Sequence, residues 1–186
     1  MLSTENEKLI TKLINLKCFK HGVFTLKSGK KSNYYIDLRC LVSHPTILKE
    51  ICELLKRKID TFENTEKKLL CGLPYAGLPY AFGISMLSDI PLIMLRKEPK
   101  KHGTAKMIEG SFQKDEELIL IDDILTSGTS ILESLEHLKD FKITTIFIVV
   151  DRDEGGKEKL EKLGYKVISL FTINDFIRYE SNSHST

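Results

Sequence analysis

Helix-like and strand-like hydrophobic patterns alternate along the chain. Four segments place apolar residues every three or four positions with charged residues between them, which predicts amphipathic helices. These expected helices span 4–19, 45–62, 157–163 and 173–179. Five short runs rich in aliphatic and β-branched residues predict strands, at 68–73, 90–95, 118–121, 143–150 and 167–171. The alternation predicts an α/β fold with a parallel sheet of about five strands and helices on both faces.

A β-hairpin is expected over residues 22–39. The β-forming residues of 23–25 and 34–36 flank the turn-rich sequence SGKKSN. Its lysines and tyrosines are, on composition alone, most simply interpreted as a charged sheet edge.

The segment 118–130, LILIDDILTSGTS, carries the strongest chemical signal. A buried strand at 118–121 leads into Asp122 and Asp123, then into a hydroxyl-rich turn and a helix start. The backbone N–H groups of 127–130 have no partner within the coming helix, and they can therefore surround a phosphate. The carboxylates need hydrogen-bond donors, such as sugar hydroxyls or metal-bound waters. A ribose phosphate satisfies both requirements. The alternative is that the acidic pair ends a strand and a Ser or Thr caps a helix.

Three further segments carry candidate contacts. The loop after the first central strand, GLPYAGLPYAFG, has small residues that allow backbone to approach a diphosphate. Residues 96–106 concentrate cations, although a solvated loop is the usual interpretation of such a run. Arg152 follows the strand at 143–150, where it could simply pair with Asp151 or Asp153.

Composition bounds these interpretations. The chain has 186 residues, 41% of them hydrophobic, and a formal net charge of +2. The length suits one α/β domain, and the charge is too small to indicate a nucleic-acid partner. The four cysteines form no CxxC pair, and no apolar run reaches the length of a membrane span, so we expect a cytoplasmic protein.

The sequence IDDILTSGTS resembles the motif with which type I phosphoribosyltransferases bind 5-phosphoribosyl 1-diphosphate (PRPP). FTLKSG, SNYYIDLR and RKEPKKHG are similar to segments of the orotate phosphoribosyltransferase family. This resemblance implies a type I phosphoribosyltransferase fold in one domain over residues 1–186. A small hood would comprise about residues 1–40 plus the C-terminal part, and the core would span about 45–170.

The resemblance also implies a reaction: transfer of phosphoribose from PRPP to N1 of orotate, giving orotidine 5-monophosphate and diphosphate in pyrimidine biosynthesis. Mg²⁺ would be the cofactor, held mainly through PRPP and not by direct protein ligands. The partners would be PRPP, orotate and a second copy of the chain, because in this family a loop matching 96–106 closes over the partner's site. No nucleic acid or membrane partner is implied.

Residue roles follow from the same resemblance. The acidic pair would contact the ribose hydroxyls and the following loop would hold the 5-phosphate. PRPP-binding positions would be Lys27, Tyr75, Ala76, Arg96, Lys97, Lys100, His102, Asp122, Asp123, Ile124, Leu125, Thr126, Ser127, Gly128, Thr129 and Ser130. Orotate-binding positions would be Tyr34, Tyr35, Thr126 and Arg152, and catalytic ones Lys100, His102, Asp122 and Asp123. Many bacterial members have a lysine where this chain has Ala76, so the diphosphate must find its cations elsewhere.

Two rival functions keep parts of this pattern. A purine or uracil phosphoribosyltransferase would share the central motif but gives no reason for SNYYIDLR or for Arg152. A PRPP-sensing regulator would need a nucleic-acid surface or a further domain, which the length and the weak net charge disfavour.

Overall fold

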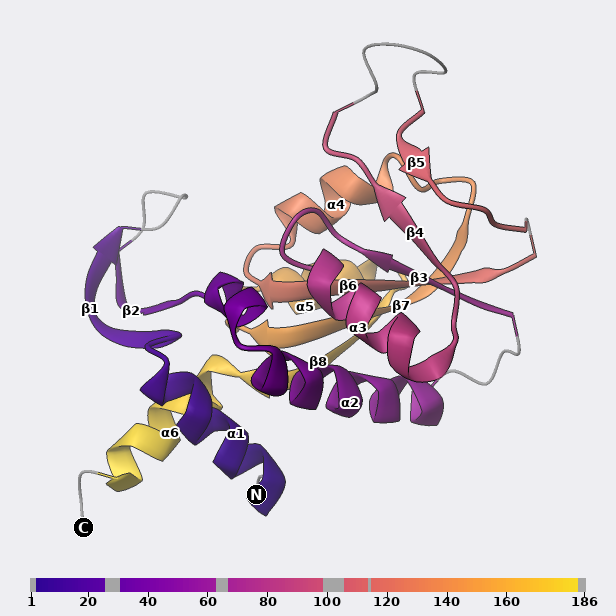
Figure 1. Ribbon diagram of the computed structural model, residues 1–186. Coiled ribbons are helices and arrows are strands. Elements are labelled where there is room, and N and C mark those ends of the chain that lie inside the picture. The colour runs from indigo at the N-terminus through magenta and orange to yellow at the C-terminus, as the bar shows by residue number, and fades with distance from the viewer. Residues whose placement is uncertain (1–2, 26–30, 63–66, 99–105, 114, 184–186) are drawn as a thin grey trace.

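A six-stranded sheet forms the centre of the computed structural model, which describes residues 3–25, 31–62, 67–98, 106–113 and 115–183. Its strand order is β5-β4-β3-β6-β7-β8, and only β5 runs antiparallel to its neighbour. The strands are β3 (Lys68–Gly72), β4 (Leu92–Leu95), β5 (Ile108–Glu109), β6 (Glu117–Leu125), β7 (Lys142–Asp151) and β8 (Lys166–Thr172). Figure 1 shows this sheet between two layers of helices. The expected α/β class is confirmed, with one short antiparallel edge strand that the sequence did not predict.

Alternate residues of the central strands enter two different cores. Leu70, Ile119 and Ile121 join the core beneath α2 (Pro45–Phe62) and α3 (Leu78–Ser88). Leu69, Leu118 and Leu120 join the core that includes residues of α4 (Thr129–Leu135) and α5 (Gly156–Lys162). Because successive strand residues point to opposite faces, a strand covered on both sides must be apolar throughout. This explains the continuous hydrophobic runs of the sequence.

The N-terminal hairpin and two helices gather beside the sheet (Figure 1). Strands β1 (Phe19–Thr25) and β2 (Lys31–Ile36) pair antiparallel, as expected, next to α1 (Thr4–Asn15) and α6 (Ile173–Ser183). The ring of Phe19 stacks on that of Phe176 at 5.5 Å. The Thr11 hydroxyl donates to the Tyr179 hydroxyl at 2.6 Å. The two ends of the chain therefore pack together around the hairpin.

Several boundaries differ from those expected. Strand β6 continues to Leu125, beyond the expected end at Ile121. The segment expected as a contact loop contains helix α3. A 3-10 helix, η1 (Arg39–Ser43), links the hairpin to α2. Among the described residues, no helix combines the length and the apolar character needed to cross a bilayer.

Candidate functional site

The acidic pair lies in the last part of β6, inside the sheet. Asp122 is in register with Ile148 of β7, and it accepts a hydrogen bond from the Asp123 N–H at 3.0 Å. The Asp123 carboxylate accepts the Ile124 N–H at 2.8 Å. Burial, and then the neighbouring charge of Asp123, raises the pKa of Asp122 well above its usual value, and burial raises the pKa of Asp123. A partner that donates hydrogen bonds would relieve this cost of burying charge.

The hydroxyl-rich loop follows directly at the end of β6. Gly128 has a φ of 74°, and the chain turns there into α4. The Ser127 and Thr129 hydroxyl oxygens lie 3.0 Å apart. Ser127, Thr129 and Ser130 are exposed, whereas Thr126 is half-buried. These hydroxyls are therefore available to a ligand.

The two aliphatic positions of the motif are directed into the protein. Leu125 is 1% exposed and belongs to the core beside α4 and α5, while Ile124 packs against the other core. The Leu125 carbonyl accepts the Arg152 N–H at 2.9 Å. Any ligand contact at Leu125 would therefore have to come from backbone atoms, whereas Ile124 is only partly buried.

The loop between β3 and α3 lies against β6. The Leu73 N–H donates to the Ile121 carbonyl at 2.8 Å, and a Cβ on Gly77 would lie 2.2 Å from that same oxygen. Only glycine permits this close approach. The Pro74–Tyr75 peptide bond is cis. Tyr75 and Ala76 line a cavity of about 250 Å³ together with Asp123.

Two of the expected cations lie in the described part of the chain, and one of them, Lys97, contacts this loop. The Lys97 ammonium lies 4.5 Å from the centre of the Tyr75 ring. Arg96 is paired with Glu109 of β5 at 3.3 Å, and its backbone N–H donates to Met107. Lys27, Lys100 and His102 lie outside the described residues.

Arg152 is a buried cation at the end of β7. Its side chain is 5% exposed and pairs with Glu154 at 2.9 Å, a different carboxylate from the two, Asp151 and Asp153, that the sequence offered as alternatives. Its Nη2 donates to the Ser32 hydroxyl at 3.4 Å, and its guanidinium carbon lies 5.9 Å from the Tyr34 ring. The buried Nε has no hydrogen-bond partner among the described residues. A buried donor on a cation that lacks a partner can donate a hydrogen bond to a bound anion.

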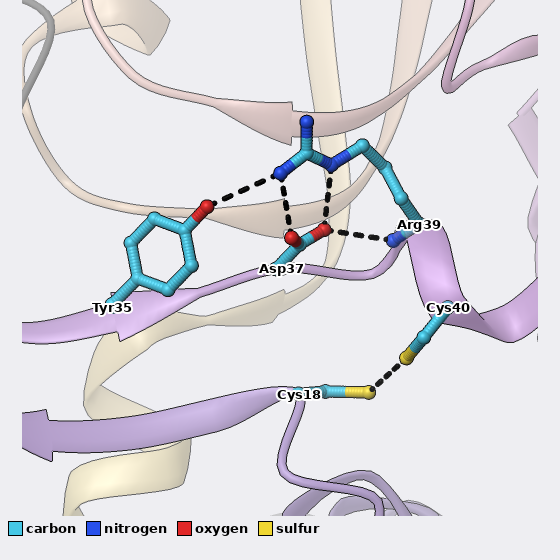
Figure 2. Close-up of polar contacts among 5 residues, drawn as sticks. All are labelled: Cys18, Tyr35, Asp37, Arg39 and Cys40. Carbon is cyan, nitrogen blue, oxygen red and sulfur yellow. Dashed lines mark hydrogen bonds and ion pairs between the residues drawn. The ribbon is translucent and has the colours of Figure 1, made fainter.

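The structure also brings together residues that the motifs did not single out (Figure 2). The Arg39 guanidinium donates to both carboxylate oxygens of Asp37, at 2.8 and 2.6 Å, and to the Tyr35 hydroxyl at 3.2 Å. The sulfurs of Cys18 and Cys40 lie 3.4 Å apart. Burial chiefly raises the pKa of the Cys18 thiol to about 12. Asp37 and Arg39 stand in the SNYYIDLR segment, which was their only signal in the sequence.

Comparison with known proteins decides the family. The sequence model described as phosphoribosyl transferase domain matches residues 39–182. The chain is 37% identical to an orotate phosphoribosyltransferase of Pyrococcus horikoshii over 174 residues, which cover 92% of this chain and 93% of the relative. The chain belongs to the orotate phosphoribosyltransferase family.

Solved structures of this family agree. The crystal structure of orotate phosphoribosyltransferase from Aeropyrum pernix superposes with a TM-score of 0.81 at 29% identity, over 93% of this chain and 98% of that one. The UMP synthase of Leishmania donovani gives a TM-score of 0.84 at 34% identity, over 96% of this chain and 39% of the synthase. The predicted membership of the orotate phosphoribosyltransferase family and the predicted fold are therefore confirmed.

Proposed function

We propose that this chain transfers the 5-phosphoribosyl group of PRPP to N1 of orotate, giving orotidine 5-monophosphate and diphosphate for pyrimidine biosynthesis. The observation that carries the proposal is the buried Arg152 with its unpaired Nε beside Tyr34. Orotate is a planar base with a carboxylate, and a guanidinium beside an aromatic ring suits both features. We assign Tyr34, Tyr35, Thr126 and Arg152 to the base.

PRPP is assigned to the end of β6 and the loops around it. The Asp122 and Asp123 carboxylates would accept hydrogen bonds from the ribose hydroxyls, which relieves the cost of burying them. Exposed hydroxyls at 127, 129 and 130 and the loop's backbone N–H groups would hold the 5-phosphate. The loop with Tyr75 and Ala76 would receive the diphosphate, close to Lys97.

The reaction needs positioning and charge stabilisation more than a base. When the bond between C1 of the ribose and the diphosphate oxygen breaks, positive charge develops on the sugar and negative charge on the leaving group. N1 of orotate forms the new bond to C1 and loses its proton, which passes to water or to an oxygen of the departing diphosphate. We assign the cations Arg96, Lys97, Lys100 and His102 to the leaving group, with Lys27 toward the PRPP or orotate end of the site. Positive charges held close to the departing diphosphate stabilise the transition state.

Mg²⁺ is the proposed cofactor. Its function when bound is to neutralise diphosphate oxygens. Among the described residues, no group of three or more His, Cys, Asp or Glu side chains is arranged to hold a metal ion. The carboxylate of Asp123 lines the same cavity as Tyr75 and Ala76, where it can accept hydrogen bonds from waters on an ion that the substrate carries. This donor set fits an ion held mainly through PRPP.

A homodimer is proposed as the working assembly, and one surface supports it. On α3, Phe82 and Met86 lie one helical turn apart and are 47% and 84% exposed. Apolar side chains grouped on one helix face are typical of protein interfaces. A second copy of the chain is the partner that the family resemblance implies. The cytoplasmic location expected from the sequence stays a prediction.

A substrate panel tests the proposed function. With PRPP and Mg²⁺, we expect orotate to be consumed and neither adenine, hypoxanthine nor uracil to be converted at a comparable rate. Conversion of a purine or of uracil in place of orotate would favour the first rival. PRPP binding without conversion of any base would favour a regulator.

A further inference from the structure

Arg39 is held in one orientation by its own segment of chain. Its Nε and Nη2 both donate to the Asp37 carboxylate, at 2.8 and 2.6 Å, and the Arg39 backbone N–H donates to the same carboxylate at 3.0 Å. Nη2 also donates to the Tyr35 hydroxyl at 3.2 Å. A guanidinium fixed through two of its nitrogens has little rotational freedom left to lose when it binds a ligand.

The third nitrogen of this guanidinium is available. Figure 2 shows it directed away from Asp37, and nothing in the described part of the chain hydrogen-bonds to it. The Arg39 side chain is 67% exposed, so a ligand can reach it. Asp37 therefore occupies two nitrogens of the Arg39 guanidinium and leaves the third available to a second anion.

Arg39 lies where the leaving group is expected. It lines the cavity of about 250 Å³ that also contains Asp123, Tyr75 and Ala76. The pKa of Arg39 is raised, chiefly by its hydrogen bonds to Asp37, and the negative charge of Asp123 adds to this effect. The loop carrying Tyr75 and Ala76 offers small and aromatic side chains but no cation of its own. A diphosphate against that loop therefore lacks a fixed positive charge on the side of η1.

We propose that Arg39 supplies this charge, binding the diphosphate of PRPP through its free nitrogen, and that Asp37 is the positioning residue that holds it. This inference rests on the proposed function, because it takes PRPP as the ligand. It adds to the site a cation from η1, while the other cations assigned to PRPP are Lys27 and cations of the segment 96–102.

The direction in which Asp37→Asn changes the PRPP affinity distinguishes a positioning role from a simple effect of charge. If only net charge mattered, Asp37→Asn would strengthen the binding of an anion by removing a nearby negative charge. If Asp37 orients Arg39, the same change weakens the binding of PRPP, because the Arg39 guanidinium loses the carboxylate that holds it in place. The two explanations predict opposite shifts in PRPP affinity.

The experiment compares three ligands by calorimetry without orotate: PRPP with Mg²⁺, diphosphate with Mg²⁺, and ribose 5-phosphate. For Arg39→Ala we expect the Kd of PRPP and of diphosphate to rise roughly tenfold or more, the effect of one lost charge-assisted hydrogen bond, with ribose 5-phosphate unchanged. Arg39→Lys, which keeps the charge but not the fork, should fall between wild type and Arg39→Ala. Asp37→Asn should raise the Kd of PRPP and of diphosphate.

Arg57→Ala is the matched control, since Arg57 forms an exposed ion pair with Glu5 in another part of the molecule. If Arg39→Ala weakened the binding of all three ligands equally, or left the Kd of diphosphate unchanged, the proposed role of Arg39 would be overturned. If Arg39→Ala does not fold, Arg39→Lys allows the same comparison. Unchanged or tighter PRPP binding by Asp37→Asn would overturn the positioning role. Because these are binding measurements, a wild type that binds PRPP without consuming orotate would contradict the proposed function, while the ligand series would still decide the role of Arg39.

Discussion

The guanidinium carbon of Arg152 lies 5.9 Å from the centre of the Tyr34 ring, which joins the end of β7 to the N-terminal hairpin. The same guanidinium donates to Ser32 and pairs with Glu154, and its Nε remains without a partner among the described residues. A cation buried in this way is costly unless an anion completes its hydrogen bonds. Under the proposed function, this contact would link the N-terminal hairpin to the choice of substrate.

Asp122→Asn should stabilise the free protein and impair the enzyme. Folding raises the pKa of Asp122, chiefly through burial, so the folded chain holds the proton more tightly than the unfolded chain does. Stability is then lost as the pH rises from the usual carboxyl range through the raised pKa. Asparagine keeps an acceptor for the Asp123 N–H without this loss. We expect a higher melting temperature at neutral pH, by roughly 2–4 °C per kcal/mol regained, and about tenfold or more slower turnover.

Thermal unfolding of both proteins from about pH 4 to pH 8 measures this effect. Asp140→Asn, at an exposed aspartate, is the control, and its melting temperature should match that of the wild type over this pH range. A lower melting temperature for Asp122→Asn at neutral pH would show that the buried carboxylate stabilises the free fold.

Gly77→Ala should damage the PRPP site through the backbone. A Cβ at Gly77 would lie 2.2 Å from the Ile121 carbonyl and 2.6 Å from the Leu73 nitrogen, so the loop must move away from β6. We expect a loss of about 1–3 kcal/mol of folding free energy and a raised KM for PRPP. Gly164→Ala is the comparison, because that position has open space but a φ of 93°. It should cost about 1–2 kcal/mol without changing the KM.

Lys100→Ala should lower turnover by about 10²- to 10³-fold, by analogy with the loss of one donor to a developing anion. The fold should be intact, as judged by circular dichroism and melting temperature. Lys101→Ala is the control, because it removes the same charge at the neighbouring position, to which no role is assigned. Near-normal turnover of Lys100→Ala would remove this residue from the mechanism.

Met86→Glu should shift the assembly toward monomers. Met86 is 84% exposed on α3, and a carboxylate buried there against a second copy would lack a partner. Light scattering after size-exclusion chromatography measures the mass of both proteins. Leu163→Glu, at an exposed apolar residue beside α5, should leave the mass unchanged. Equal masses for wild type and Met86→Glu would exclude this face as the interface.

The sequence predicted helices and strands well where hydrophobic periodicity and end signals agree. The helix expected at 45–62 has those bounds in the structure, since a proline opens it and apolar residues recur on one face. Helix α3 was not predicted because apolar residues lie on all of its faces, including the exposed Phe82 and Met86. It therefore has no amphipathic pattern. Strand β6 was predicted too short because Asp122 and Asp123 are charged residues paired within a sheet.

The candidate site divides in the same way. The central motif and Arg152 are contiguous with predicted strands, so local sequence located them. The approach of Tyr34 to Arg152 and of Cys18 to Cys40 depends on how distant segments pack. The position of Arg39 on the cavity likewise follows from η1, which the sequence did not predict. Local patterns do not encode such tertiary contacts.

The most direct test compares orotate with uracil, which lacks the carboxylate, in wild type and in Arg152→Met. Methionine fills similar apolar space, and Glu154, which loses its partner, is 32% exposed and remains accessible to water, so the fold should survive. The account predicts that kcat/KM for orotate falls on the order of a hundredfold or more while PRPP binding and uracil turnover do not fall. Orotate turnover close to wild type in Arg152→Met would contradict the claim that this buried guanidinium selects the base.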